Sequence, residues 1–431
     1  MLFLAAASAA EQRMARVLKE FDRICRGPLW PGYEPCRTPL AIFDGQRTWL
    51  VRHPNPPPEF VASRLRGDSF VFSGHHAALR ANTGIELAGT PTASAMLDDP
   101  SQEPRLSAAL LIHEAFHVFQ AKRHPGWGAN EADLFVYPVE IPPALALRRL
   151  ESESLRRALA AGSRSSAGTW AARALEVRRE RFALLPTSAA SYERGTETKE
   201  GLARYVEARA GGPAVSIFPE AEFSAGAVRD RAYASGAAMA LLLDRLDPDW
   251  KRRFEKNDTL TLDELLGRAA HGARAEVFSA AETQEAGRRA EADVAAWVSQ
   301  RSALRREILE AAVWKVVLEA EDPVFPQGFD PLNVERLSAS EVLHKRWIKL
   351  GNASGSLETL GRRCLTVSAG KHPLFEGVSR ATVALAAEPR VEERPGILKI
   401  SAEGLTLEFR GARLIRSDHT LRVEIPKPPA Q

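Results

Sequence analysis

Apolar and polar residues alternate over short stretches in the first part of the chain. Between Pro39 and Leu97, runs such as Thr48-Trp49-Leu50-Val51 and Ser69-Phe70-Val71-Phe72 are separated by turns rich in proline and glycine. A period of two residues is typical of strands that bury one face. The pattern therefore predicts a small sheet near the N-terminus.

The spacing of apolar residues becomes helical over residues 106–298. Long segments rich in Ala, Leu, Arg and Glu lie at 143–161 and 166–185, and we expect them to form an antiparallel helical hairpin. The pairs Arg148-Arg149 and Arg178-Arg179 stand among glutamates in these segments. We interpret them as solvated helix faces.

Strand patterns return after a helical stretch that contains Trp314 and a proline-bearing break from Pro323 to Pro331. Two hairpins are expected there. One pairs Ile397–Ile400 with Leu405–Phe409 around the Glu403-Gly404 turn, and the other pairs Arg413–Ile415 with Leu421–Ile425 across Asp418-His419. This part of the chain predicts a β-rich domain.

Composition and charge narrow the class of protein. The chain has 431 residues, of which 45% are hydrophobic and 26% charged, as in a soluble globular protein of two or three domains. Its 58 basic and 55 acidic residues give a net charge of +3 without a basic stripe, so nucleic acid is not an expected partner. No stretch approaches the ~20 apolar residues of a membrane-spanning helix, so no transmembrane segment is expected.

The N-terminus and the cysteines bear on location. Met1 to Ala10 is an apolar run that ends in Ala-Ser-Ala-Ala, as before a signal-peptide cleavage site, but it lacks a basic start. This interpretation predicts export to the periplasm or the exterior. The alternative, the apolar start of a helix that continues through Glu11–Phe21, leaves a cytoplasmic location open.

Cys25 and Cys36 are close enough in sequence to pair in an oxidising compartment, whereas Cys364 is expected to be a buried small hydrophobe.

One predicted helix carries residues suited to bind a metal. The segment Ser107–Gln120 has no proline or glycine and contains the motif His113-Glu114-Ala115-Phe116-His117. Histidines four residues apart project from one helix face with Cβ atoms roughly 5–6 Å apart, so both can reach one ion. Glu114 is rotated toward the open coordination position, where it can act as a general base on water activated by zinc. A chance occurrence of the motif is the alternative, and the apolar helix around it argues against that.

A catalytic zinc needs a third protein ligand, which we sought on another helix. Glu200 opens the segment Glu200-Gly201-Leu202-Ala203-Arg204-Tyr205-Val206-Glu207, in which Gly201 and Ala203 would allow a close approach to the histidine helix. Glu197 precedes Glu200 at helical spacing. The sequence therefore favours Glu200 as the ligand and leaves Glu197 as an alternative.

These segments resemble the gluzincin metallopeptidases, which carry HExxH and a distant glutamate. Residues 200–207 are similar to the Glu-Gly-x-Ala-x-Tyr-x-Glu helix of the aminopeptidase branch, and Tyr233-Ala234-Ser235-Gly236-Ala237 to its Tyr-x-Lys-Gly-Ala segment, with Ser235 in place of lysine. The resemblance covers about residues 105–245. It implies that His113, His117 and Glu200 bind Zn²⁺, that Glu114 is the general base, that Glu207 orients a ligand or a neighbouring helix, and that Tyr233 stabilises the oxyanion.

The chain also departs from that family. The 82 residues between His117 and Glu200 exceed the family's short connection, and the excess coincides with the expected hairpin, which we interpret as an insertion. The family's Gly-x-Met-Glu-Asn segment, which holds the substrate amine, has no complete counterpart, so aminopeptidase specificity is not implied. Thr92–Met96 is a partial counterpart and a candidate for the edge strand with which gluzincins pair a peptide.

The expected fold class is α+β, with a zincin-like catalytic core, an N-terminal mixed sheet, a mainly helical middle and a small β-rich C-terminal domain. The expected boundaries are 1–10 for a signal-peptide remnant, 11–104 for the N-terminal α/β part of the catalytic domain, 105–310 for the helical core with its inserted hairpin at about 143–185, and 320–431 for the β-rich domain.

The expected function is zinc-dependent hydrolysis of a peptide or protein substrate. The alternative is a non-catalytic zincin-fold protein that recognises a protein or glycan through its C-terminal β domain. The oligomeric state does not follow from the sequence.

Overall fold

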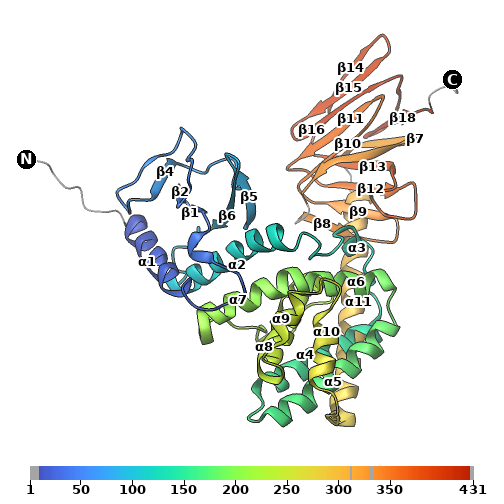
Figure 1. The fold of residues 1–431 in the computed structure, drawn as a ribbon. Helices are drawn as coiled ribbons and strands as arrows, with labels where there is room; N and C mark the ends of the chain where they lie inside the picture. The colour runs from blue at the N-terminus through green and yellow to red at the C-terminus, as the bar shows by residue number, and fades with distance from the viewer. Residues whose placement is uncertain (1–8, 311–312, 331–332, 428–431) are drawn as a thin grey trace, which may run out of the picture. The chain divides into compact units, whose positions relative to one another are not determined.

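The structure is a computed structural model that describes residues 9–310, 313–330 and 333–427. It has the expected α+β composition, with a mixed N-terminal sheet, a helical middle and a largely antiparallel C-terminal sheet (Figure 1). The chain divides into two compact units, one comprising the residues up to Asn130 with Ile141–Ala290, and the other Glu131–Glu140 with the residues from Glu291 onward. Most of the proposed signal-peptide remnant, residues 1–8, lies outside the described residues.

The first unit opens with a helix and a six-stranded sheet. Its elements are α1 (Ala9–Ile24), the short turn η1 (Pro35–Arg37), β1 (Leu40–Phe43), β2 (Arg47–Val51), β3 (Val61–Ala62), β4 (Ser69–Ser73), β5 (Thr83–Leu87) and β6 (Thr90–Met96). The strand order is β3-β4-β2-β1-β6-β5, in which only β1 and β6 are parallel. Strand β5 is therefore an edge of this sheet.

The alternation in the sequence separates the two faces of the sheet. Ile42 and Trp49 belong to the core that includes residues of α1 and of α2 (Pro104–Arg123). Ala41 and Leu50, one position away, belong to a smaller apolar cluster with Phe60. Because successive strand residues point to opposite faces, one face of the sheet packs on the helices and the other contributes to the smaller apolar cluster. Helix α2 is thereby held against the sheet.

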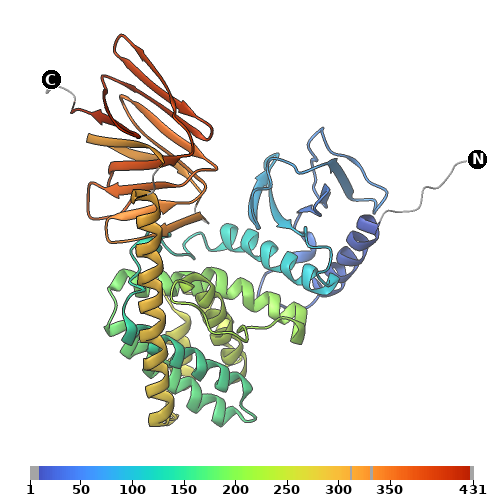
Figure 2. The ribbon, with the colours of Figure 1, turned by 180° about the vertical axis from the view of Figure 1, so that it is seen from behind.

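Helices make up the rest of this unit. They are α4 (Pro142–Ala160), α5 (Arg164–Ala183), α6 (Thr187–Thr196), the π-helical turn η2 (Glu197–Gly201), α7 (Leu202–Gly211), η3 (Gly212–Ala214), α8 (Val228–Leu246), α9 (Trp250–Phe254) and α10 (Leu262–Ala269). The expected helical pair at 143–161 and 166–185 is present as α4 and α5. The long helix α11 (Ala280–Glu310) follows α10 (Figure 2).

The interpretation of the basic pairs in α4 and α5 as solvated faces is wrong for three of the four arginines. Arg148, Arg149 and Arg178 are only 5%, 8% and 3% exposed. Arg178 lies 3.0 Å from Glu151 and 2.9 Å from Glu197. Arg178, Glu151 and Glu197 belong to a buried ion-pair network, whose other members are Arg181, Glu193, Arg231 and Asp263. Arg148 instead donates hydrogen bonds to the Ser224 and Ala225 carbonyls, and Arg149 pairs with Glu222. Burial of the three arginines is tolerated because each meets a carboxylate or a carbonyl from another segment of the chain, which the pattern of one helix does not reveal.

The second unit contains α3 (Ala132–Phe135) and a twelve-stranded sheet. Its strands are β7 (Trp314–Phe329), β8 (Val334–Arg336), β9 (Glu341–His344), β10 (Trp347–Asn352), β11 (Gly355–Leu360), β12 (Cys364–Ser368), β13 (Val378–Leu385), β14 (Arg390–Arg394), β15 (Ile397–Ala402), β16 (Leu405–Arg410), β17 (Arg413–Ser417) and β18 (Thr420–Ile425). Both expected hairpins are present, as β15–β16 and β17–β18. Gly404 adopts φ +71° in the first turn, where a Cβ atom would lie 2.3 Å from the Leu360 carbonyl oxygen.

Two expectations for the start of this sheet are wrong. Trp314 begins strand β7 rather than lying in a helix, and the strand continues through Pro323 to Phe329. The prolines lie near the point where β7 stops pairing with β13 and starts pairing with β10, and both pairings shift register. Proline is tolerated at such irregular positions because no regular ladder hydrogen bond is required from it.

The cysteines behave as expected. Cys25 and Cys36 form a disulfide, and Cys364 is buried and free. The disulfide closes a loop whose Trp30 packs edge-on against Phe116 of α2, with ring centroids 5.6 Å apart. No helix within the described residues has the length and apolarity needed to span a membrane.

Candidate metal centre

Helix α2 presents the two histidines of the HExxH motif on one face. Their rings are 4.8 Å apart between centroids, and His113 is 5% exposed. The backbone just before them is held from outside the helix, because the Tyr33 hydroxyl donates a 2.7 Å hydrogen bond to the Ile112 carbonyl. The helical spacing predicted from the sequence therefore brings both imidazoles to one place.

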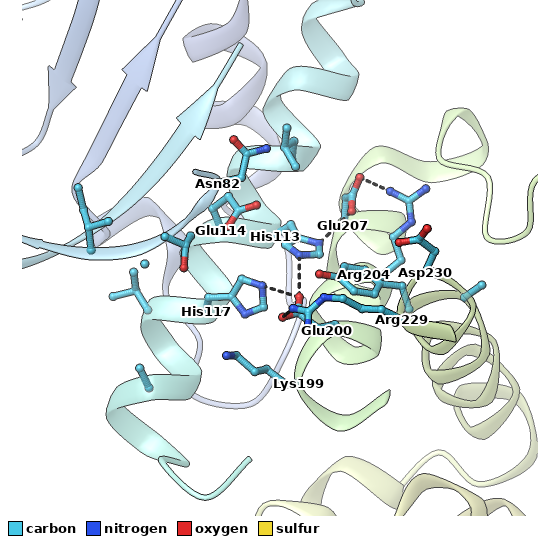
Figure 3. A pocket seen from close by; sticks show the side chains of 18 of the residues that line it. Asn82, His113, Glu114, His117, Lys199, Glu200, Arg204, Glu207, Arg229 and Asp230 are labelled. Atoms are coloured by element: carbon cyan, nitrogen blue, oxygen red, sulfur yellow. Dashed lines mark hydrogen bonds and ion pairs between the residues drawn. The ribbon is translucent and has the colours of Figure 1, made fainter. Parts of the chain in front are cut away.

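The π-helical turn η2 brings Glu200 to the histidines. Its Oε2 atom lies 3.1 Å from Nε2 of His117 and 3.8 Å from Nε2 of His113. One donor atom from each of the three residues lies within 4.8 Å of the other two. Figure 3 shows the three side chains converging on one space. Single π-helical turns within α-helices occur frequently at functional sites.

The same turn directs Glu197 away from the histidines. Its carboxylate accepts a 2.9 Å hydrogen bond from Arg178 and a 2.6 Å hydrogen bond from Ser235. Of the two candidate ligands, Glu200 therefore lies at the histidines and Glu197 in the buried ion-pair network. Ser235, which replaces the lysine of the resembling segment, also faces this network. A lysine there would add another positive charge to a site already crowded with arginines.

Both histidines are held by a second contact through Nδ1. The Nδ1 atom of His113 lies 3.0 Å from Oε2 of Glu207, and that of His117 lies 2.9 Å from Oε1 of Gln120. The Gln120 amide also donates a 2.9 Å hydrogen bond to the Lys199 carbonyl, which ties α2 to η2. Contacts of this kind orient a ligating imidazole and leave Nε2 toward the ion. Glu207 was expected from the sequence, whereas Gln120 was missed although it stands three residues after His117.

These charged groups lie close together and shift one another's pKa values. Burial lowers the pKa of His113, but hydrogen bonds with Glu200 and Glu207 outweigh it and raise the pKa to about 9. Burial lowers the pKa of His117. For Glu200, burial opposes ionisation, yet hydrogen bonds from both histidines hold its pKa far below the ordinary value. A deprotonated carboxylate thus faces the two imidazoles.

Glu114 is a buried carboxylate beside the histidines. It is 3% exposed, and its Oε2 atom is buried without a hydrogen-bond partner in the described part of the chain. Burial raises its pKa to about 7, with a further contribution from the negative charges of Glu200 and Glu207. A carboxylate with a pKa near neutrality is suited to accept and return a proton.

Tyr233 lies on α8 beside His113, with the two rings nearly parallel at 13° and their centroids 6.1 Å apart. Burial, and then the negative charge of Glu200, raise the pKa of Tyr233, so its phenol stays protonated. Helix α8 reaches η2 through a glycine contact. A Cβ atom on Gly201 would lie 2.6 Å from Cα of Gly236. Gly201 thus permits a close approach to α8, not to α2 as expected.

A cleft of about 1140 Å³ opens in front of these residues. One wall is the edge strand β5, and others come from α2, α7 and α8 (Figure 3). The expectation that Thr92–Met96 is an edge strand is wrong, because β6 lies between β1 and β5. The preceding strand, Thr83–Leu87, occupies the edge. The order of two adjacent strands in a sheet does not follow from their sequence patterns alone.

Comparisons of the chain with models of known protein families, with characterised proteins and with solved structures gave no match. The functional interpretation therefore depends on the motifs and on the geometry of the cleft.

Proposed function

We propose that this protein is a zinc-dependent peptidase with a gluzincin-like catalytic core. The observation that carries the proposal is the convergence, in one cleft, of the triad His113, His117 and Glu200 with Glu114 and Tyr233. These residues come from three separate helical segments, α2, η2 and α8. A chance HExxH motif would not be expected to meet a carboxylate and a phenol of the right kinds in a cleft.

The residues fit a zinc ion. Two imidazole nitrogens and one carboxylate oxygen are the protein ligands of many catalytic zinc sites, which keep a further position open. Here the three donor atoms lie within 4.8 Å of one another, and the centre lines a cleft. When bound, zinc would supply a Lewis acid and lower the pKa of water to about 7.

The chain's own residues would carry the proton and stabilise charge. Glu114, with its unpartnered Oε2 atom, would take a proton from the attacking water and pass it to the leaving amine. The Tyr233 phenol would donate a hydrogen bond to the oxyanion that forms from the scissile carbonyl. Glu207 and Gln120 would keep the two imidazoles oriented.

The shape of the cleft supports a polypeptide substrate. Strand β5 lines it and, as an edge strand, offers backbone N–H and C=O groups to an extended peptide. Apolar side chains from several elements, among them Ile85, Val118 and Ile217, line the same space and could receive peptide side chains. We propose that the substrate binds alongside β5.

Export is proposed from the disulfide between Cys25 and Cys36 together with the apolar start of the chain. Disulfides persist in oxidising compartments and are rare in the cytosol. Cleavage of the chain near Ala10 in its natural host, established by sequencing the mature N-terminus, would support export.

The proposed function is tested by hydrolysis of a mixed peptide library by zinc-loaded protein. Glu114→Gln should lower the rate by roughly 10²–10⁴-fold, because it removes the general base. Glu180→Gln is the control, because Glu180 lies at an exposed position of α5 and is not among the cleft residues. Equal turnover by the Glu114→Gln variant and wild type would overturn the proposed mechanism, and no hydrolysis by either would leave the non-catalytic binding protein as the better explanation.

A further inference from the structure

Arg229 is a cation in the cleft that belongs to none of the motifs recognised in the sequence. It lies in the first turn of α8, four residues before Tyr233, and its side chain is 33% exposed. Its Nη2 atom donates a 2.9 Å hydrogen bond to Oε1 of Glu200. Figure 3 shows the guanidinium reaching across the cleft toward Glu200.

The two carboxylate oxygens of Glu200 thus have different neighbours. Oε2 faces Nε2 of His117 and His113, at 3.1 and 3.8 Å, whereas Oε1 is held by Arg229. A hydrogen bond between a guanidinium and a carboxylate is charge-assisted, and it is stronger and more directional than a neutral one. The contact restricts rotation of the carboxylate and keeps one oxygen toward the histidines.

The same guanidinium also approaches the tyrosine. The central carbon of the Arg229 guanidinium lies 5.8 Å from the centre of the Tyr233 ring. Because both residues are on α8 and Glu200 is on η2, Arg229 connects the third ligand to the helix that carries the phenol. Glu207 and Gln120 hydrogen-bond the two imidazoles, whereas Arg229 and Tyr233 hydrogen-bond Glu200.

We propose that Arg229 is a positioning residue for Glu200, which fixes Oε1 so that Oε2 is presented to the metal. This inference rests on the proposed zinc site. It assigns to Arg229 the role for the third ligand that Glu207 and Gln120 have for the first two. Partners that orient metal ligands typically contribute 10–100-fold to metal affinity.

The sign of the change in zinc affinity distinguishes this role from a simple electrostatic effect. Removing a positive charge next to the site would by itself favour a divalent cation. Loss of orientation acts in the opposite direction. A fall in zinc affinity in Arg229→Met therefore indicates positioning and not charge.

The experiment measures zinc affinity by chelator competition in the full-length protein, for wild type, Arg229→Met, Arg229→Lys and Arg245→Met. We expect affinity to fall roughly 10–100-fold in Arg229→Met. Arg229→Lys should recover part of the loss, because lysine can reach the same oxygen but lacks the planar fork. Arg245, in the last turn of α8 and not among the cleft residues, is the matched control.

Two further measurements distinguish a change at the metal site from a loss of folded structure. The visible spectrum of the cobalt-loaded protein should change in Arg229→Met and not in Arg245→Met, and the melting temperatures of the zinc-free proteins should agree. Unchanged or tighter zinc binding by Arg229→Met overturns the positioning role while the zinc site stands. Failure of the wild type to bind zinc overturns the proposed function itself.

Discussion

At the scale of single residues, the centre depends on which carboxylate of one helical turn faces the histidines. Glu197 and Glu200 are three residues apart and both are buried, at 1% and 5% exposed. Glu197 pairs with Arg178, and Glu200 lies at His117. Glu197 therefore belongs to the ion-pair network of the helical part, and Glu200 belongs to the proposed metal site.

This assignment predicts that substitution of one glutamate weakens zinc binding, whereas the same substitution of the other lowers the stability of the fold. Glu200→Gln should weaken zinc binding by more than roughly 100-fold, which exceeds the usual effect of removing a residue that only orients a metal ligand. Glu197→Gln should leave zinc affinity unchanged and lower the free energy of unfolding by about 3 kcal/mol, because buried arginines lose a charged partner. Chelator competition and thermal unfolding measure the two effects. The reverse pattern would make Glu197 the ligand.

Residue patterns in the sequence identified five residues of the proposed centre and one supporting residue, Glu207, but not the other supporting contacts. His113, Glu114 and His117 share one helix, so their spacing alone places them together. Glu200 and Tyr233 came from segments whose residue types resemble a known family. Gln120 and Arg229 were missed, because each acts through a contact with another element, and sequence spacing shows only neighbours within an element.

At the scale of secondary-structure elements, the crossing of η2 and α8 determines how close Glu200 and Tyr233 come. The two backbones touch at Gly201 and Gly236, where side chains are absent. A Cβ atom on Gly236 would lie 2.6 Å from the Glu197 carbonyl oxygen and 2.8 Å from Cα of Gly201. Backbone atoms cannot move aside as a flexible side chain can, so any larger residue must separate the elements.

Gly236→Ala should therefore lower the free energy of unfolding by about 1–3 kcal/mol, as expected for overpacking, and should reduce peptidase activity by displacing Tyr233. Gly267→Ala is the control, because Gly267 lies in α10 and its nearest contact would be Leu175 at an ordinary 3.8 Å. That substitution should stabilise the helix by about 0.5–1 kcal/mol. Equal stability of Gly236→Ala and wild type would show that the crossing is not tight.

The buried ion-pair network links α4, α5, α6 and α8, and it should make this part of the protein sensitive to acid. Burial alone would raise the pKa of Glu193, but the charge of Arg181 and its hydrogen bond outweigh burial and lower the pKa to about 2. A carboxylate with a lowered pKa stabilises the fold above its unfolded pKa, and that contribution is lost as pH falls toward the folded value.

Glu193→Gln should therefore be less stable than wild type at about pH 6, and the difference should narrow as the pH falls from the unfolded value of about 4.5 toward 2. The expected difference at the higher pH is on the order of 3 kcal/mol. Denaturant unfolding at a series of pH values measures it, with Glu180→Gln, at an exposed position of α5, as control. A difference that stays constant over this range would contradict the stabilising role of the Glu193 charge.

At the scale of the whole molecule, the residues of the proposed metal centre all belong to the first compact unit. Prediction of the fold from the sequence succeeded where the pattern is local, as in the hairpin of α4 and α5 and the β15–β16 turn. It failed where the outcome depends on distant partners. Arg178 and Arg181 of α5 are buried because they pair with glutamates of α4 and α6, and β7 runs through two prolines because its pairing partner changes there.

The zinc content of the purified protein, measured by elemental analysis, is a direct test of the proposed zinc site. That site predicts one zinc ion per chain in wild type, none in His117→Ala, and full content in His76→Ala, whose histidine pairs with Glu59 and is not among the cleft residues. Absence of zinc from the wild type after reconstitution, or equal zinc in wild type and His117→Ala, would contradict it.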